Sequence, residues 1–162
     1  MKTVGYMPIS ESNLSQYKFY VDLDGVMANF NKKFDTSDNR TMWKYINSLY
    51  KVNEPIWGDL ELMYDADILW NYVKKYDPTF LTATGAQYLS YGGKEKKEWV
   101  KKHFGNYETI VVERGVGKAK YASPKAILID DTKKNIDAWN EAGGIGILHK
   151  DARTTIKQLE KL

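Results

Sequence analysis

The stretch YKFYVDLDG, residues 17–25, combines the pattern of a β-strand with two carboxylates at its end. Polar and apolar side chains alternate up to Leu23, and the aromatic and β-branched residues among them favour a strand. Asp22 and Asp24 are two positions apart, so their side chains lie on the same side of an extended chain. Gly25 lets the backbone turn sharply directly after them. We therefore expect chemistry at the carboxyl end of this strand.

Strands and helices alternate through much of the remaining chain. Further strands are expected at residues 79–82, 108–113, 125–129 and 145–148, and helices at residues 66–75, 94–104, 133–142 and 154–162. The run KAILI at 125–129 is almost continuously apolar, as in a parallel strand buried on both faces. This order predicts an α/β protein with a three-layer, Rossmann-like parallel sheet, whose ligands bind beyond the carboxyl ends of the strands.

Residues between the first two strands break this alternation with a helical pattern of their own. Apolar side chains recur there at spacings of three and four until Pro55 interrupts them, at Trp43, Ile46, Leu49 and Tyr50. We interpret residues 32–76 as a small helical cap inserted after the first strand, and residues 1–31 and 77–162 as the α/β core.

Composition excludes several classes of site. The 162 residues contain no cysteine, which rules out disulfides, thiolate zinc sites and a cysteine nucleophile. The two histidines lack the partner spacing of a zinc site and are expected to be structural or exposed. A net charge of +3 is too small to indicate nucleic-acid binding. No apolar stretch approaches the ~20 residues that cross a bilayer, and no apolar signal core begins the chain, so we expect a cytoplasmic protein without a membrane partner.

Three polar clusters each follow an apolar strand: residues 22–25 (DLDG), 82–85 (TATG) and the pair Asp130-Asp131. In a parallel sheet they would meet at one edge, where four carboxylates repel one another unless a divalent cation is bound, and hard oxygen ligands select Mg²⁺. One aspartate could attack phosphorus while a second carboxyl group protonates the leaving oxygen and then activates water. Taken singly, Asp-x-Asp-Gly is more often a turn, and the aspartate pair could be a helix N-cap. The combination favours phosphate chemistry.

Here the sequence resembles a known family. VDLDGVMANF at residues 21–30, FLTATG at 80–85 and ILIDDTKKNIDAW at 127–139 are similar, in order and spacing, to the signature motifs of haloacid dehalogenase-like phosphatases. Within that superfamily the chain most resembles the 5'(3')-deoxyribonucleotidases, which have a DxDGVxADF opening, a small helical cap and an LLIDD-like last motif. The resemblance implies a Mg²⁺-dependent phosphomonoesterase that dephosphorylates deoxynucleoside monophosphates through an aspartyl-phosphate.

The resemblance also assigns roles by position. Asp22 becomes the nucleophile, and Asp24 the general acid/base that also gives its backbone carbonyl to the metal. Thr82 and Ala83 would bind the phosphate, although some nucleotidases have a serine at the second of these positions. The implied metal ligands are Asp22, Asp24 and Asp131, with Asp130 in or just outside the coordination shell.

A lysine ahead of the last motif is implied to pair with the phosphoryl group and with Asp22. Lys120, ten positions before the aspartate pair, fits the family spacing and is the expected residue; Lys118 is the first substitute, and Lys125 is also near. Lys96 resembles a second phosphate-contacting lysine of the nucleotidases. Five lysines lie between residues 94 and 102, however, and most are expected on a solvated helix face.

Aromatic residues are the expected substrate contacts. Phe30 matches an aromatic position of the nucleotidase motif, and Trp57 follows Pro55 on an expected loop, so both are candidates for the substrate pocket, whereas Trp43 falls on an apolar helix face and is expected in the core. Two alternatives stay open at this point. One is a phosphatase of nucleic-acid 3' ends or small sugar phosphates; the other is a catalytically silent binding protein with the same fold.

Overall fold

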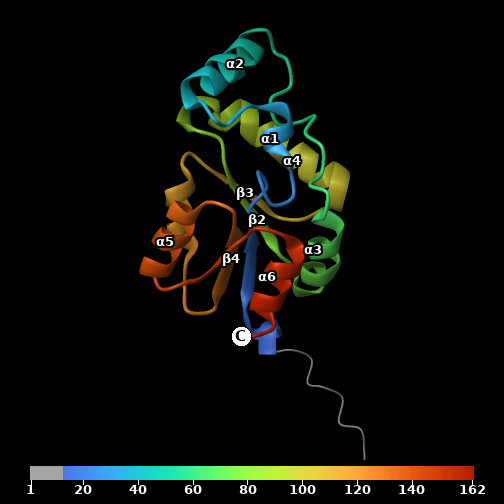
Figure 1. The fold of residues 1–162 in the computed structure, drawn as a ribbon, viewed down its shortest axis with the longest axis vertical. Coiled ribbons are helices and arrows are strands. Elements are labelled where there is room, and N and C mark those ends of the chain that lie inside the picture. The colour runs from blue at the N-terminus through green and yellow to red at the C-terminus, as the bar shows by residue number, and fades with distance from the viewer. Residues whose placement is uncertain (1–12) are drawn as a thin grey trace, which may run out of the picture.

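The structure, a computed structural model, describes residues 13–162. Within this range one parallel sheet of five strands has the order β3-β2-β1-β4-β5 (Figure 1). The strands are β1 (Lys18–Val21), β2 (Thr79–Ala83), β3 (Thr109–Val112), β4 (Ala126–Asp130) and β5 (Ile145–Leu148). Because β1 lies between β2 and β4, its carboxyl end is flanked on both sides by other strands. The predicted fold class is confirmed.

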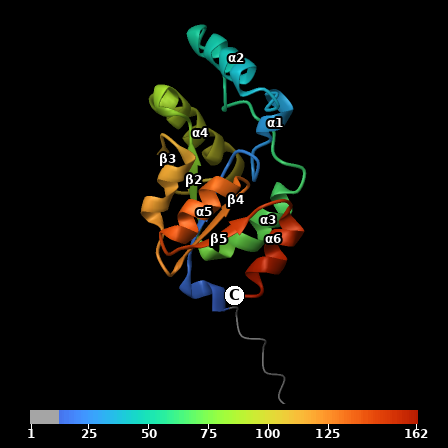
Figure 2. The same ribbon diagram turned by 60° about the vertical axis from the view of Figure 1, so that its left-hand side comes forward.

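Helices cover both faces of this sheet (Figures 1 and 2). One face carries α3, α4 and α6, and the other carries α5 and the 3₁₀ helix η4. Their bounds are α3 (Ala66–Val73), α4 (Leu89–Phe104), α5 (Lys133–Glu141), α6 (Ala152–Leu159) and η4 (Gly115–Tyr121). Shorter 3₁₀ turns are η1 (Asn13–Gln16), η2 (Lys74–Tyr76) and η3 (Ala86–Tyr88). No helix within residues 13–162 combines the length and apolarity needed to cross a bilayer.

The core consists of two apolar clusters, one on each face of the sheet. Alternate residues of a strand enter different clusters: on β4, Ile127 and Ile129 pack with α3 and α6, whereas Leu128 packs with Trp139 of α5. All five residues of β4 are buried, as expected for a strand covered on both faces. The continuous apolar run at 125–129 thus reflects burial from two sides.

The predicted insertion contains all of α2 (Asn39–Lys51) and the second half of α1 (Phe30–Lys33), which begins two residues ahead of it. Helix α2 lies at the end of the molecule farthest from α6 (Figure 2). Helix α3 also falls within the predicted cap, but it packs against α6 because Leu69 and Val73 belong to the main core. We therefore propose that the cap ends ahead of Ala66 rather than at residue 76.

Helix α4 begins at Leu89 and not at residue 94, where the sequence pattern placed its start. Gly92 and Gly93 are weak helix formers, so the pattern underestimated the first turn. Both glycines are buried within the helix.

Candidate active site

The first element of the site is the turn that follows β1. Asp22 comes directly after the strand and is only 6% exposed. Gly25 has a φ of +82°, a conformation that side chains with a Cβ rarely adopt. A Cβ at this position would also collide with the carboxylate of Asp131. The glycine is therefore needed both for the turn and for the close approach of the neighbouring strand end.

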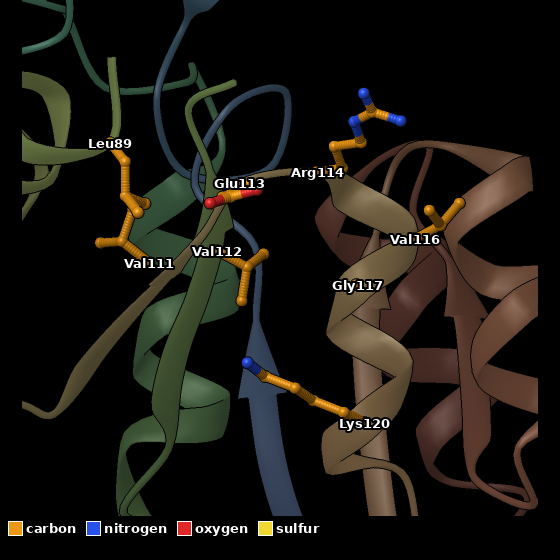
Figure 3. A pocket seen from close by; sticks show the side chains of 8 residues that line it. All are labelled: Leu89, Val111, Val112, Glu113, Arg114, Val116, Gly117 and Lys120. Carbon is orange, nitrogen blue, oxygen red and sulfur yellow. The ribbon is translucent and has the colours of Figure 1, made fainter. Parts of the chain in front are cut away.

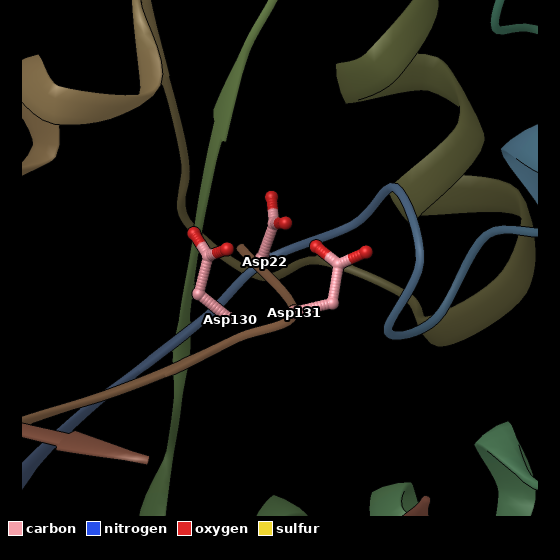
Figure 4. A group of neighbouring side chains, drawn as sticks. All are labelled: Asp22, Asp130 and Asp131. Carbon is pink, nitrogen blue, oxygen red and sulfur yellow. The ribbon is translucent and has the colours of Figure 1, made fainter. Parts of the chain in front are cut away.

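The second element is the end of β4, which the sheet brings beside Asp22. Val21 and Ile129 are register partners, and the Asp22 N–H donates to the Ile129 carbonyl at 2.9 Å. Carboxylate oxygens of Asp22, Asp130 and Asp131 consequently lie within 4.8 Å of one another (Figure 4). Asp130 is fully buried, whereas Asp131 faces the open side.

Lys118 on η4 is the cation at the centre of this group. Its ammonium lies 2.8 Å from Asp22 Oδ1 and 2.6 Å from Asp130 Oδ2, and the residue is 1% exposed. Asp130 also accepts hydrogen bonds from the Thr132 N–H at 2.9 Å and from the Asn135 side chain at 3.2 Å. Both carboxylate oxygens of Asp130 thus accept hydrogen bonds from the protein.

The structure corrects the expected lysine, because Lys118 and not Lys120 reaches Asp22. A 3₁₀ helix has about three residues per turn, so side chains two positions apart leave it in different directions. Lys120 is exposed and lies over the ring of Tyr121, 5.2 Å from its centroid, beside a separate pocket (Figure 3). Lys125 lies over the Tyr17 ring.

Lys96 forms a second buried cationic centre on the other side of Asp24. Its ammonium donates to Asp24 Oδ2 and to Thr82 Oγ1, each at 2.8 Å, and the side chain is 1% exposed. Asp24 Oδ1 finds no hydrogen-bond partner among the described residues. The other lysines between residues 94 and 102 are exposed, as expected. Lys96 therefore connects the motif that follows β1 with the last residues of β2.

The charges around Asp22 do not balance. Burial, with the charge of Asp130, raises the pKa of Asp22 well above its ordinary value although Lys118 acts in the opposite direction. Desolvation by the surrounding protein and the same neighbour raise the pKa of Asp131 to about 6, even though part of its side chain faces solvent. Burial alone would lower the pKa of Lys118, but the two carboxylates outweigh it and raise that pKa. One ammonium faces three carboxylates, which leaves an excess of negative charge.

These residues fit a hard divalent cation. All donors in the group are carboxylate oxygens, they converge within 4.8 Å, and their excess charge disfavours ionisation in the absence of a further cation. Mg²⁺ prefers oxygen ligands at about 2.1 Å and commonly keeps several waters. Asp22 and Asp131 are the carboxylates best placed to hold it, because Asp130 is engaged by Lys118, Thr132 and Asn135.

An open pocket of about 440 Å³ adjoins this group. Besides Asp22, Asp24, Asp131 and Lys118, its walls include Phe30, Asn31, Thr36, Ala83 and Asn135. Phe30 and Ala83 thus lie where the sequence placed substrate contacts. Trp57 does not form a wall: it is 2% exposed and packs against α4. Trp43, expected in the core, is 40% exposed and stacks on Tyr88.

Sequence reasoning missed two neighbours of these groups. Asn135 donates to Asp130 from the first turn of α5, and its position five residues after that aspartate is the only signal that could have suggested it. Glu95 binds the backbone of the loop that carries Trp57. It was hidden in a lysine-rich helix, where a glutamate between lysines normally indicates a solvated surface.

Comparison with known proteins identifies the fold. No family model matches the chain, and no curated protein matches its sequence. A hydrolase from Streptococcus pneumoniae TIGR4 superposes with a TM-score of 0.54 at 12% identity, over 91% of this chain and 100% of its own. A hydrolase from Pseudomonas syringae superposes with a TM-score of 0.55 at 12% identity, over 91% of this chain and 99% of its own. An uncharacterized protein from Corynebacterium glutamicum superposes with a TM-score of 0.50 at 14% identity, over 89% of this chain and 92% of its own. The chain therefore has the α/β, Rossmann-like fold of these structures, two of which are hydrolases.

Proposed function

We propose that the protein is a hydrolase of phosphate monoesters that acts through Asp22. The observation that supports this most strongly is the arrangement around that residue: a buried carboxylate at the carboxyl end of the central strand, ion-paired with Lys118 and lying beside two further aspartates. A purely structural aspartate at a strand end does not need a buried lysine and an uncompensated acidic neighbour. Perturbed ionisation of this kind is typical of functional sites.

The first half of the reaction is a transfer to Asp22. Its carboxylate oxygen forms a bond to phosphorus, the ester P–O bond breaks, and the leaving oxygen takes a proton from Asp24. Lys118 holds the attacking carboxylate in position from 2.8 Å and contributes positive charge where the phosphoryl group is transferred. Mg²⁺ held by Asp22 and Asp131 would supply further charge neutralisation of the phosphoryl oxygens.

The second half returns Asp22 to its starting state. A water molecule attacks phosphorus of the aspartyl-phosphate, gives its proton to Asp24, and displaces the Asp22 carboxylate, so inorganic phosphate leaves. Asp24 suits this double role because Lys96 fixes one of its oxygens while the other has no hydrogen-bond partner among the described residues. Thr82 accepts a hydrogen bond from the same lysine, and its side chain is buried.

For the substrate we propose a deoxynucleoside 5'- or 3'-monophosphate, as the resemblance to the nucleotidases implies. Phe30 supports this choice because its aromatic ring forms part of the pocket wall beside Asp22 and Asp24. A nucleobase stacked on an aromatic side chain is stabilised by roughly 1–3 kcal/mol. A sugar phosphate has no flat ring with which to use this surface.

The test is a panel of deoxy- and ribonucleoside monophosphates, sugar phosphates and a 3'-phosphorylated oligonucleotide, each with MgCl₂ and with excess EDTA. We expect the highest kcat/KM for a deoxynucleoside monophosphate and loss of at least about 100-fold with chelator, because the carboxylates then repel the phosphate. Full activity in EDTA would contradict the metal-assisted mechanism. Better turnover of the oligonucleotide or of a sugar phosphate would replace the proposed substrate, and inactivity on the whole panel would indicate a silent binding protein.

A further inference from the structure

A loop of the insertion is held against α4 by hydrogen bonds, at its two ends from Tyr91 and Trp99 and at its centre to the carboxylate of Glu95. Glu95 accepts hydrogen bonds from three consecutive backbone N–H groups, those of Ile56 and Trp57 at 3.0 Å and that of Gly58 at 3.3 Å. On the opposite side of the same loop, the ammonium of Lys33 donates to backbone carbonyl oxygens. The loop is thus fixed from both sides by charged groups, and charge-assisted hydrogen bonds of this kind are roughly twice as strong as neutral ones.

The binding of the loop backbone by Glu95 determines where the Trp57 side chain lies. The Trp57 ring centroid is 5.1 Å from the ammonium of Lys96, the residue that follows Glu95 on α4. One turn earlier, Gly92 leaves room for the ring, because a Cβ there would come within 2.5 Å of it. Three residues of one helix therefore form a seat for Trp57: one gives space, one binds its backbone and one lies against its face.

This seat has a consequence for Asp24. Lys96 is a buried cation whose ammonium donates to Asp24 and Thr82, and water that reached it would compete for both bonds. The Trp57 ring excludes that water and interacts favourably with the cation. Releasing the loop would hydrate Lys96 and loosen the carboxylate beside it.

We propose that Glu95 is a positioning residue of the active site, acting through Trp57 and Lys96 to hold Asp24 in the orientation for proton transfer. This inference rests on the proposed phosphatase function and assigns a role to a residue outside the pocket. A carboxylate that only stabilised the loop would affect all substrates alike. One that positions the general acid should matter most where the leaving group needs a proton.

The experiment compares wild type, Glu95→Gln and the control Glu98→Gln on p-nitrophenyl phosphate and on an alkyl monophosphate. Glutamine places an N–H₂ group against N–H donors and removes the charge, whereas Glu98 is an exposed glutamate on the same helix. We expect Glu95→Gln to lower kcat/KM for the alkyl ester about tenfold more than for p-nitrophenyl phosphate, whose leaving group departs without a proton. Glu98→Gln should resemble wild type on both esters. Hydrogen exchange of the amides at 56–58 should accelerate only in Glu95→Gln.

Equal losses on the two esters, or unchanged exchange at 56–58, would overturn the role of Glu95. If Glu95→Gln does not fold, Trp57→Leu removes the cover from Lys96 and is expected to give the same ester-selective loss; equal losses there would also overturn the inference. A wild-type protein that hydrolyses neither ester would instead refute the proposed function itself.

Discussion

The two halves of the site are built by different means. Asp22, Asp130 and Asp131 lie together because β1 and β4 are adjacent and in register, so the backbone alone determines their positions. Lys96 and Lys118 instead reach the site from helices, through the packing of long side chains. The first half follows from strand order, and the second depends on which of several lysines becomes buried.

The halves also differ in charge. Lys96 faces one carboxylate, that of Asp24, whereas Lys118 faces the three aspartates at the strand ends. The Lys96 side is therefore balanced within the protein, and the strand-end side needs a further cation. We expect changes on the strand-end side to abolish chemistry, and changes farther from it to modify the rate, the substrate preference or the stability.

The largest expected effect is that of Asp22→Asn. The amide is a poor nucleophile, so turnover should fall by about 10⁴-fold or more, in line with other lost nucleophiles. The melting temperature should stay at or above that of wild type, because burial and Asp130 already disfavour the charged carboxylate. Asp67→Asn, on the exposed face of α3, is the control. Near-normal turnover in purified Asp22→Asn would refute the assignment.

The next effect compares two lysines on the same 3₁₀ helix. Lys118→Met should lower kcat by about 10²–10³-fold, because it removes a fixed charge from the transferring phosphoryl group. It should also cost about 3–5 kcal/mol of unfolding free energy, because buried aspartates lose their partner. Lys120→Met, at the exposed position in Figure 3, should change the unfolding free energy by less than about 0.5 kcal/mol. Urea unfolding measures the free energy, and steady-state kinetics measure kcat. A larger loss in Lys120→Met than in Lys118→Met would instead assign the role to Lys120, the lysine favoured by spacing.

The same comparison explains what could be predicted from the sequence. The strand at residues 145–148 was predicted at its observed bounds, and the aspartates were placed at one edge because parallel order alone brings them there. Lys118 was ranked below Lys120 because the register of a short 3₁₀ helix leaves no mark in the sequence. Trp57, expected at the pocket, is buried, and Trp43, expected in the core, is partly exposed. Their burial depends on contacts with α4 and η3, which are distant in the sequence.

A smaller effect should come from the pocket wall, where the insertion meets the strand ends. Phe30→Ala should lower kcat/KM for a deoxynucleoside monophosphate by about 5- to 150-fold, the equivalent of losing about 1–3 kcal/mol of stacking. Turnover of p-nitrophenyl phosphate should change much less, since the carboxylates and Lys118 are untouched. Parallel kinetics on the two substrates decide the point. Equal losses would mean that Phe30 supports the fold of the site and does not contact a base.

The smallest expected effect is on the pH dependence of stability and comes from His149, which is hydrogen-bonded to the end of β4. This side chain is 4% exposed, and its Nδ1 lies 2.7 Å from Thr155 Oγ1. The backbone N–H of His149 donates to the backbone carbonyl of Asp130. Burial lowers its pKa below the ordinary 6.5, and nearby acidic groups offset this only in part. As the pH falls below 6.5, the unfolded chain therefore binds a proton that the folded protein excludes, and stability is lost.

We expect this group to remove unfolding free energy between pH 7.5 and pH 5.5, by less than the limit of about 1.4 kcal/mol per pH unit for one proton. Asp131 has the opposite sign, because its raised pKa makes the folded state the better proton acceptor as the pH falls through about 6. The informative quantity is therefore the difference between wild type and His149→Gln, in which the contribution of Asp131 cancels. Urea unfolding in EDTA at pH 7.5, 6.5 and 5.5 should show wild type losing stability relative to the variant at each step. Parallel curves would mean that His149 is protonated as easily in the folded protein as in the unfolded chain, and that its buried setting does not hold the imidazole neutral.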